Sequence, residues 1–157
     1  MKNTLREMAR VAEYLWQKGW AERNAGNMSV NLTGLVKAKY TRKEGIVYEL
    51  EEACPDLEGE FILLSGSGTR MRNLAAKPAK NVCLLRIGEG GKSYTLFNHS
   101  KDDLMPTSEL STHLSIHQKL LQQGGLQKAL LHTHVNEIIA LTQIPDFTSE
   151  AAINKLL

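Results

Sequence analysis

Two stretches of the chain repeat apolar residues every three or four positions, the spacing of an amphipathic helix. The first stretch has apolar side chains at Leu5, Met8, Val11, Ala12, Leu15 and Trp16. Thr4 and Glu7 form a capping-box pattern that predicts the start of this helix, and Gly19 predicts its end. The second stretch lies within residues 107–125, has Leu110, Leu114, Ile116, Leu120 and Leu121 at near-helical spacing, and closes on Gly124.

Short apolar runs between these helices are typical of β-strands. The candidates are residues 28–32, 46–50, 60–64, 81–88, 92–98 and 128–135, and a short helix is expected at 136–144. Glu89, Gly90 and Gly91 separate two of the runs and predict a β-hairpin, so the sheet is at least partly antiparallel. We therefore expect an α/β fold in which residues 1–157 form a single domain, with a largely antiparallel or mixed sheet covered by helices.

Composition narrows the class of protein. A length of 157 residues suits one ordinary domain, and 42% apolar with 23% charged residues is typical of a globular chain that folds. The net charge of +2 comes from scattered basic residues, which argues against nucleic acid as a partner and is compatible with a small anionic ligand. No apolar stretch approaches the roughly 20 residues that span a bilayer, so no membrane partner is expected. Cys54 and Cys83 lie far apart and no signal-peptide pattern precedes them, which predicts a cytoplasmic protein with reduced thiols.

Two histidines stand one residue apart in the strand candidate 128–135. If this run is a strand, His132 and His134 share one face, and their imidazoles could bind a single metal ion. The alternative is that they are ordinary hydrogen-bonded histidines at the border of the core. A zinc site also needs a third protein ligand, so the pair by itself does not define one.

Three loops have a composition suited to anions: residues 24–27, 65–69 and 106–109. Glycine lets backbone N–H groups approach a ligand, and serine, threonine and asparagine add neutral donors. Each loop alone is equally typical of an ordinary turn or helix cap. Thr107 or Ser108 at a helix start would present free N–H groups, which makes the third loop the best phosphate candidate.

Glu109 follows in the expected first turn of the same helix, where the helix dipole favours a carboxylate whatever else it does. Near two histidines, the same carboxylate could also bind a metal or move a proton. His113 and His117, at i and i+4, would lie on one helix face, and a surface or packing role is favoured over metal binding for them. His99 is expected in a loop.

Four segments in a fixed order make the chain similar to a known family: "ERNAGNMSV", "LLSGSGT", "PTSEL" and "LLHTHVNEIIALT". They resemble the zinc-dependent class II aldolase and adducin family, and most closely its members that act on L-rhamnulose 1-phosphate and L-fuculose 1-phosphate. The resemblance runs from about residue 10 to about residue 143 of this chain. Four ordered motifs are far more specific than any one of them.

The resemblance implies cleavage of a 1-phosphorylated deoxyketose into dihydroxyacetone phosphate and L-lactaldehyde, with Zn²⁺ stabilising the enediolate. By position in this sequence, His132 and His134 match zinc ligands, and Glu109 matches the catalytic acid/base, which can itself approach the metal. The positions matching the phosphate-binding residues are Asn24, Gly26, Asn27, Ser67, Gly68, Thr107 and Ser108. A phosphorylated ketose is the expected substrate, and a homotetramer the expected assembly.

The chain departs from the family in length. Family members are longer and take a third zinc histidine from a segment downstream of the H-x-H pair, so we expect this domain to be the N-terminal portion, incomplete at its C-terminal end. The third ligand would lie beyond Leu157, or His99 would replace it. Two alternatives stay open: a sugar-phosphate 4-epimerase of the same family, which usually has aspartate in place of Glu109, and a non-catalytic adducin-like interaction domain.

Overall fold

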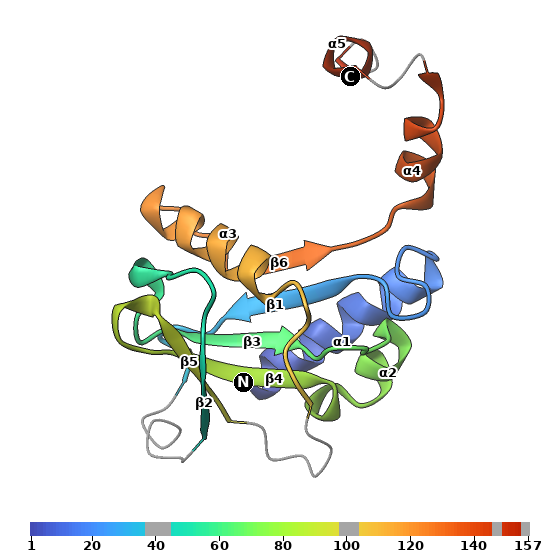
Figure 1. The fold of residues 1–157 in the computed structure, drawn as a ribbon. Helices are drawn as coiled ribbons and strands as arrows, with labels where there is room; N and C mark the ends of the chain where they lie inside the picture. Colours follow the sequence, from blue (N-terminus) through green and yellow to red (C-terminus); the bar gives the residue numbers. More distant parts are fainter. Residues whose placement is uncertain (37–44, 98–103, 146–148, 155–157) are drawn as a thin grey trace.

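A computed structural model describes residues 1–36, 45–97, 104–145 and 149–154 (Figure 1). Its helices are α1 (Lys2–Gln17), α2 (Met71–Ala76), α3 (Leu110–Gln122), α4 (Asn136–Thr142) and α5 (Glu150–Ile153), with short 3-10 turns η2 (Pro55–Leu57), η3 (Pro78–Lys80) and η4 (Glu89–Gly91). Its strands are β1 (Asn27–Asn31), β2 (Ile46–Glu49), β3 (Phe61–Ser65), β4 (Val82–Ile87), β5 (Ser93–Leu96) and β6 (Ala129–His132). In the described residues the strands form one sheet, ordered β2-β5-β4-β3-β1-β6.

Every neighbouring pair of strands in this sheet is antiparallel. The expected α/β class is therefore confirmed, and so is the hairpin, since β4 and β5 pair across η4. No helix among the described segments has the length and apolar character needed to cross a membrane.

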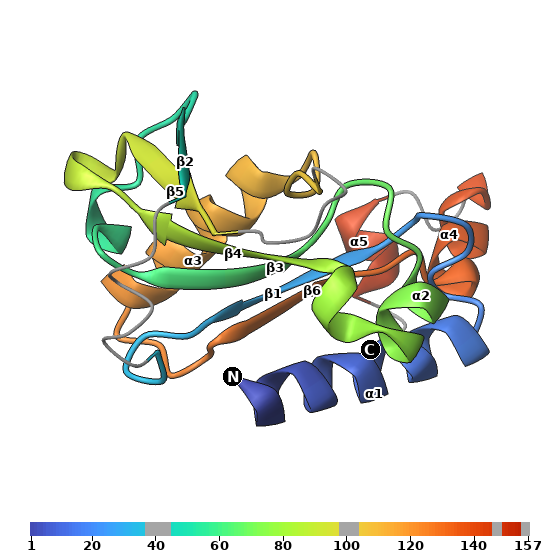
Figure 2. The same ribbon diagram turned by 90° about the horizontal axis from the view of Figure 1, so that it is seen from below.

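Helices cover both faces of the sheet (Figures 1 and 2). Because side chains alternate along a strand, Phe61 and Leu63 of β3 join the cluster formed with α1 and α2, whereas Ile62 and Leu64 join the cluster that includes Leu114 of α3. This explains why the central strands are nearly continuous apolar runs. Their two buried faces hold the sheet rigidly between two cores, so its ends are fixed positions for loops.

The ends of two elements differ from the sequence prediction. Helix α1 begins at Lys2, with Met1 as its N-cap and no side-chain cap, so the predicted capping box at Thr4 is wrong. The first helical hydrogen bond already runs from the Leu5 N–H to the Met1 carbonyl, so Thr4 lies inside the helix and is not its cap. Gly19 ends the helix region as predicted, with a φ of 72° that favours glycine.

Helix α2 was not predicted, because six residues are too few for a periodic pattern to stand out. It is held by burial of Met71 and Leu74 against α1.

Strand β6 is shorter than the predicted run 128–135. Its last pairing joins His132 to Asn27, and His134 lies beyond the strand, where its N–H donates to the Trp20 carbonyl at 2.8 Å.

The register of the sheet gathers the three anion-type loops at one end. Strand β1 begins at Asn27 between the end of β6 and the end of β3, since Asn27 pairs with His132 and Ser29 with Leu64. The loop after β3 is in turn joined to the loop before α3 by a bridge between Gly66 and Pro106. Segments far apart in the sequence therefore meet there.

Candidate functional site

A cavity of about 410 Å³ lies at this end of the sheet. It is lined by Glu22, Arg23, Asn24, Ala25, Gly26, Asn27, Gly66, Ser67, Gly68, Thr69, Thr107, Ser108, Glu109 and His134. All seven positions matched to phosphate binding are among them, together with Glu109. Three loops that are unremarkable one by one thus form the wall of one cavity.

Backbone contacts fix these loops to one another. The N–H of Ser67 donates to the Met105 carbonyl at 2.7 Å, and the N–H of Thr107 donates to the Ser65 carbonyl at 3.1 Å. Gly26 has a φ of +77°, and a Cβ there would lie 2.9 Å from the His132 carbonyl oxygen, so only glycine fits without strain. The loop at Gly26 therefore lies directly against the end of β6.

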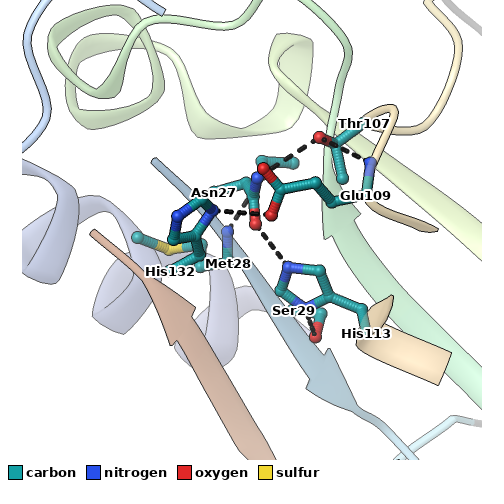
Figure 3. A network of polar contacts seen from close by, with 8 residues as sticks. Asn27, Met28, Ser29, Thr107, Glu109, His113 and His132 are labelled. Atoms are coloured by element: carbon teal, nitrogen blue, oxygen red, sulfur yellow. Dashed lines mark hydrogen bonds and ion pairs between the residues drawn. The ribbon is translucent and has the colours of Figure 1, made fainter. Parts of the chain in front are cut away.

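Glu109 lies at the entrance to helix α3 (Figure 3). It occupies the N-cap position and not the first turn as predicted, and its N–H donates to Thr107 Oγ1 at 3.5 Å. Its Oε2 lies 2.6 Å from Nδ1 of His132, on side chains that are each a little over one third exposed. The carboxylate is thus reachable from solvent and in contact with one of the two predicted metal-binding histidines.

Opposing effects act on the pKa of Glu109. Desolvation raises the pKa. A hydrogen bond from Asn27 and the nearby His132 and His113 lower it by more than desolvation raises it, so the pKa lies below its ordinary value. The carboxylate is therefore ionised at neutral pH. An ionised carboxylate can accept a proton or bind a cation.

The H-x-H pair meets only part of the requirement for a metal site. The rings of His132 and His134 lie side by side with centroids 4.9 Å apart, although His134 follows the strand. Nδ1 of His132 is buried and makes no hydrogen bond of normal geometry, although Glu109 lies close by. Such a nitrogen beside a carboxylate oxygen suits a shared cation. Within the described ranges, however, no group of three His, Cys, Asp or Glu side chains is arranged to hold a metal, and His99 lies outside them.

His113 and His117 have a packing role and are not at the surface. Both are buried on the face of α3 that meets β1, at 3% and 2% exposure. The hydroxyl of Ser29 lies 2.7 Å from Nδ1 of His113 and 2.8 Å from Nε2 of His117. A signal for this contact is present in the sequence, because the buried polar residues Asn27, Ser29 and Asn31 alternate along β1, and Ser29 faces the histidine pair of α3.

A second, apolar cavity of about 730 Å³ adjoins the first. It lies between α3, β6 and α4, and its wall includes Ile116, Leu130, Leu131, Ile138 and Ile139. Glu109 and His134 line both cavities and therefore lie at the boundary between a polar and an apolar space, whereas His132 lines the apolar cavity.

Comparison with known proteins extends this picture. The family model described as Class II Aldolase and Adducin N-terminal domain matches residues 6–155. A rhamnulose-1-phosphate aldolase from Bacteroides thetaiotaomicron is 40% identical over 153 residues, which is 96% of this chain and 56% of that protein. A rhamnulose-1-phosphate aldolase from Listeria welshimeri is 33% identical over 156 residues, covering 98% of this chain and 55% of that protein. The chain thus spans about half the length of these curated relatives.

A solved structure has the same fold. The crystal structure of a sugar-phosphate aldolase from Thermotoga maritima superimposes with a TM-score of 0.76 at 32% sequence identity. The match covers 94% of this chain and 60% of that one.

Proposed function

This chain belongs to the class II aldolase and adducin family, and from that premise we propose that the protein is a zinc-dependent aldolase. Its substrate would be a deoxyketose 1-phosphate, with L-rhamnulose 1-phosphate preferred over L-fuculose 1-phosphate, and its products dihydroxyacetone phosphate and L-lactaldehyde. Residues 1–157 would form one aldolase-like domain corresponding to the N-terminal portion of the longer relatives. We also propose a cytoplasmic homotetramer, as the family resemblance implies.

The observation that supports this proposal best is the shared cavity. Seven side chains or glycines suited to phosphate line it, and Glu109 stands at its edge beside His132. Backbone N–H groups and neutral hydroxyls can hold a phosphate without a large positive field. A phosphate held by the loops of Gly26 and Ser67 would leave the sugar carbons extending toward Glu109.

Glu109 is proposed to move the proton in carbon–carbon bond cleavage. Its ionised carboxylate would accept the proton from the substrate hydroxyl and return it to the product, which is the work of a positioned general base and acid. The phosphate loops would fix the sugar so that this hydroxyl lies within reach of the carboxylate. The apolar cavity beside Leu131 and Ile138 could accept the methyl end of the sugar.

His132 and His134 would hold the zinc ion, with Glu109 able to approach it. When bound, the zinc supplies Lewis-acid stabilisation of the negative charge that develops on the ketose oxygens. A catalytic zinc site has three protein ligands, and a Glu109 tied to the metal would be less able to move protons. We therefore propose a third histidine, downstream of Leu157 in a longer form of the protein, with His99 as the alternative.

The choice among family activities depends on Glu109. The related sugar-phosphate 4-epimerases usually have aspartate at this position, so the longer glutamate favours the aldolase. A non-catalytic adducin-like domain is disfavoured because Glu109, His132 and His134 are all retained.

The decisive experiment compares the parent with Glu109→Gln. The zinc-loaded protein, as this chain and as a longer form, is incubated with L-rhamnulose 1-phosphate or L-fuculose 1-phosphate, and release of dihydroxyacetone phosphate is measured. We expect cleavage by the parent, and a turnover lowered by about 100-fold in Glu109→Gln with an unchanged circular dichroism spectrum. If the zinc-loaded longer form cleaves neither sugar phosphate, the aldolase proposal is wrong. If Glu109→Gln retains full turnover, Glu109 is only a helix-cap residue.

The phosphate assignment has a separate test. Replacing Ser67 and Ser108 together by alanine is expected to weaken binding of inorganic phosphate much more than binding of zinc, because the two hydroxyls line only the polar cavity. Isothermal titration with each ligand measures both affinities. Equal losses of phosphate and zinc would indicate general disruption of the fold instead.

The missing zinc ligand is tested by stoichiometry. We expect this chain to bind zinc weakly, the His99→Ala variant to bind it equally weakly, and the longer form to bind one zinc ion per subunit tightly. Tight binding by this chain that is lost in His99→Ala would identify His99 as the third ligand.

A further inference from the structure

Behind the polar cavity, four buried polar side chains form a continuous chain of hydrogen bonds between α3 and β1, and Figure 3 shows the part that joins Ser29, His113 and Asn27. His117 and His113 share the hydroxyl of Ser29, and Nε2 of His113 bonds to Oδ1 of Asn27. The exposed fraction is at most 7% for all four residues, and that of Ser29 is zero. The chain of bonds ends at the cavity, because Asn27 is part of the cavity wall.

Burial lowers the pKa of His113, and it lowers the pKa of His117 to about 4, so both rings are neutral at pH 7. A neutral imidazole has one donor and one acceptor, and a hydroxyl has one hydrogen to give. Two arrangements of the hydrogen atoms then give each of the three hydrogen bonds one donor and one acceptor. In one, each bond donates toward the cavity, from His117 Nε2 to Ser29, from Ser29 to His113 Nδ1, and from His113 Nε2 to Asn27 Oδ1. In the other, every bond is reversed.

The carboxylate of Glu109 distinguishes the two directions. Asn27 Nδ2 lies 3.4 Å from Thr107 Oγ1, and Asn27 also hydrogen-bonds Glu109, which helps to lower the pKa of the carboxyl. In the reversed arrangement the amide oxygen of Asn27 would face the Glu109 carboxylate, placing two acceptors together. Only the forward direction presents the NH₂ group to Thr107, to Glu109 and to the cavity.

We propose that Ser29, His113 and His117 are positioning residues that set the direction of the Asn27 amide, so that its NH₂ group faces Thr107, Glu109 and the cavity in which the substrate phosphate is proposed to bind. The inference rests on the proposed function for the identity of the ligand. A buried polar chain that costs desolvation is best explained by such a directional task, since apolar side chains of α3 such as Leu114 fill the adjacent core without that cost.

The first test reads the tautomers directly. In a long-range ¹H–¹⁵N spectrum of the histidine-labelled full chain at pH 7.5, both His113 and His117 are expected as the Nε2–H tautomer. The reversed arrangement would give the Nδ1–H tautomer for both rings, and that result would overturn the inference. This measurement needs no substrate, so it is independent of whether the protein is an aldolase.

The second test measures the consequence for the ligand. Ser29→Ala removes the hydroxyl that joins the two histidines, and Asn27→Ala removes the amide. Each is expected to weaken binding of inorganic phosphate by about tenfold, the effect of one lost hydrogen bond, with no further loss in the double variant. Ser29→Thr keeps the hydroxyl and is expected to restore affinity. Ser115→Ala, an exposed serine on α3, is the matched control and should bind as the parent does.

The binding outcomes separate this inference from the proposed function. If Asn27→Ala weakens phosphate binding and Ser29→Ala does not, the positioning role is wrong while the phosphate site stands. If neither variant changes phosphate affinity, Asn27 has no role in phosphate binding and the positioning role is wrong, whereas the Ser67 and Ser108 variant tests the remaining phosphate site independently.

Discussion

His117 illustrates how burial changes the chemistry of one side chain. Its ring is 2% exposed, and burial, followed by the nearby His113 and Lys128, lowers its pKa from an ordinary 6.5 to about 4. The folded state therefore favours the neutral ring, whereas the unfolded chain takes up a proton as the pH falls below 6.5. Between pH 6.5 and pH 4 the unfolded state binds more protons, so the protein loses stability as the pH falls through this window.

We predict that this residue accounts for roughly 3 kcal/mol of the lost stability, since one pKa unit corresponds to about 1.4 kcal/mol. Urea unfolding of the parent and of His117→Gln, at pH 7.5 and pH 4.5, measures it. The parent should lose more stability than the variant, because other titrating groups contribute equally to both. Equal losses in the two proteins would mean that the ring is not held neutral.

At the residue scale, the sequence predicts which residues belong to the site better than it predicts which residues contact one another. Gly26, Ser67, Ser108 and Glu109 were identified as candidates, and the structure brings all of them to one cavity. The bond of Ser29 to the histidines of α3 was not predicted, because one sequence shows that a polar residue alternates along a strand but not which helix covers that face.

At the scale of elements, the tight turn before β1 carries a testable constraint. Gly26 and Gly68 both have positive φ, but only Gly26 lies against backbone, with the position of a Cβ 2.9 Å from the His132 carbonyl oxygen. Nothing lies within 4 Å of the corresponding position at Gly68. Substitutions at these two glycines therefore distinguish the cost of backbone strain from the cost of steric overlap.

We predict that Gly68→Ala costs about 1 kcal/mol of unfolding free energy, from the left-handed backbone alone. Gly26→Ala should cost a further 1 to 3 kcal/mol, roughly the penalty for overpacking, because β6 must move. Denaturant midpoints at constant slope measure both. Similar costs for the two variants would show that β6 yields easily at His132.

Elements were predictable where their pattern was long. The strands follow from short apolar runs and helices α1 and α3 from helical spacing, whereas α2 is too short to detect and its stability comes from Met71 and Leu74 in the core. The end of β6 at His132 is set by its partner β1, and a single sequence does not contain that pairing.

At the scale of the whole molecule, the surface around the apolar cavity is exposed to solvent in the described residues. Ile138 and Leu131 are 59% and 55% exposed, and β6 is an edge strand. Exposed apolar surface beside an unpaired strand edge favours association between molecules. Helix α4 is hydrogen-bonded to the main body at its first turn, through Asn136 to Gly19 and Glu137 to Trp20, and its remainder extends away from the sheet (Figure 1).

We predict that this 157-residue chain self-associates as its concentration rises, and that Ile138→Lys with Leu131→Lys reduces the association. Sedimentation velocity over a concentration series measures it. Leu126→Lys is the control, because Leu126 is 90% exposed but does not line the cavity. A parent that stays monomeric throughout, or a control that acts as strongly as the double variant, would contradict the prediction.

The pairing of β1 with β6 also determines at which stage of folding the ligand site forms. Strand β1 begins at Asn27 and its partner β6 ends at His132, so the two strands pair only after the long segment between them has been synthesised. Pairings this distant in sequence form slowly, because a long loop must close first. The nascent chain would therefore lack a complete anion pocket, and phosphate binding would appear as one of the last events of folding.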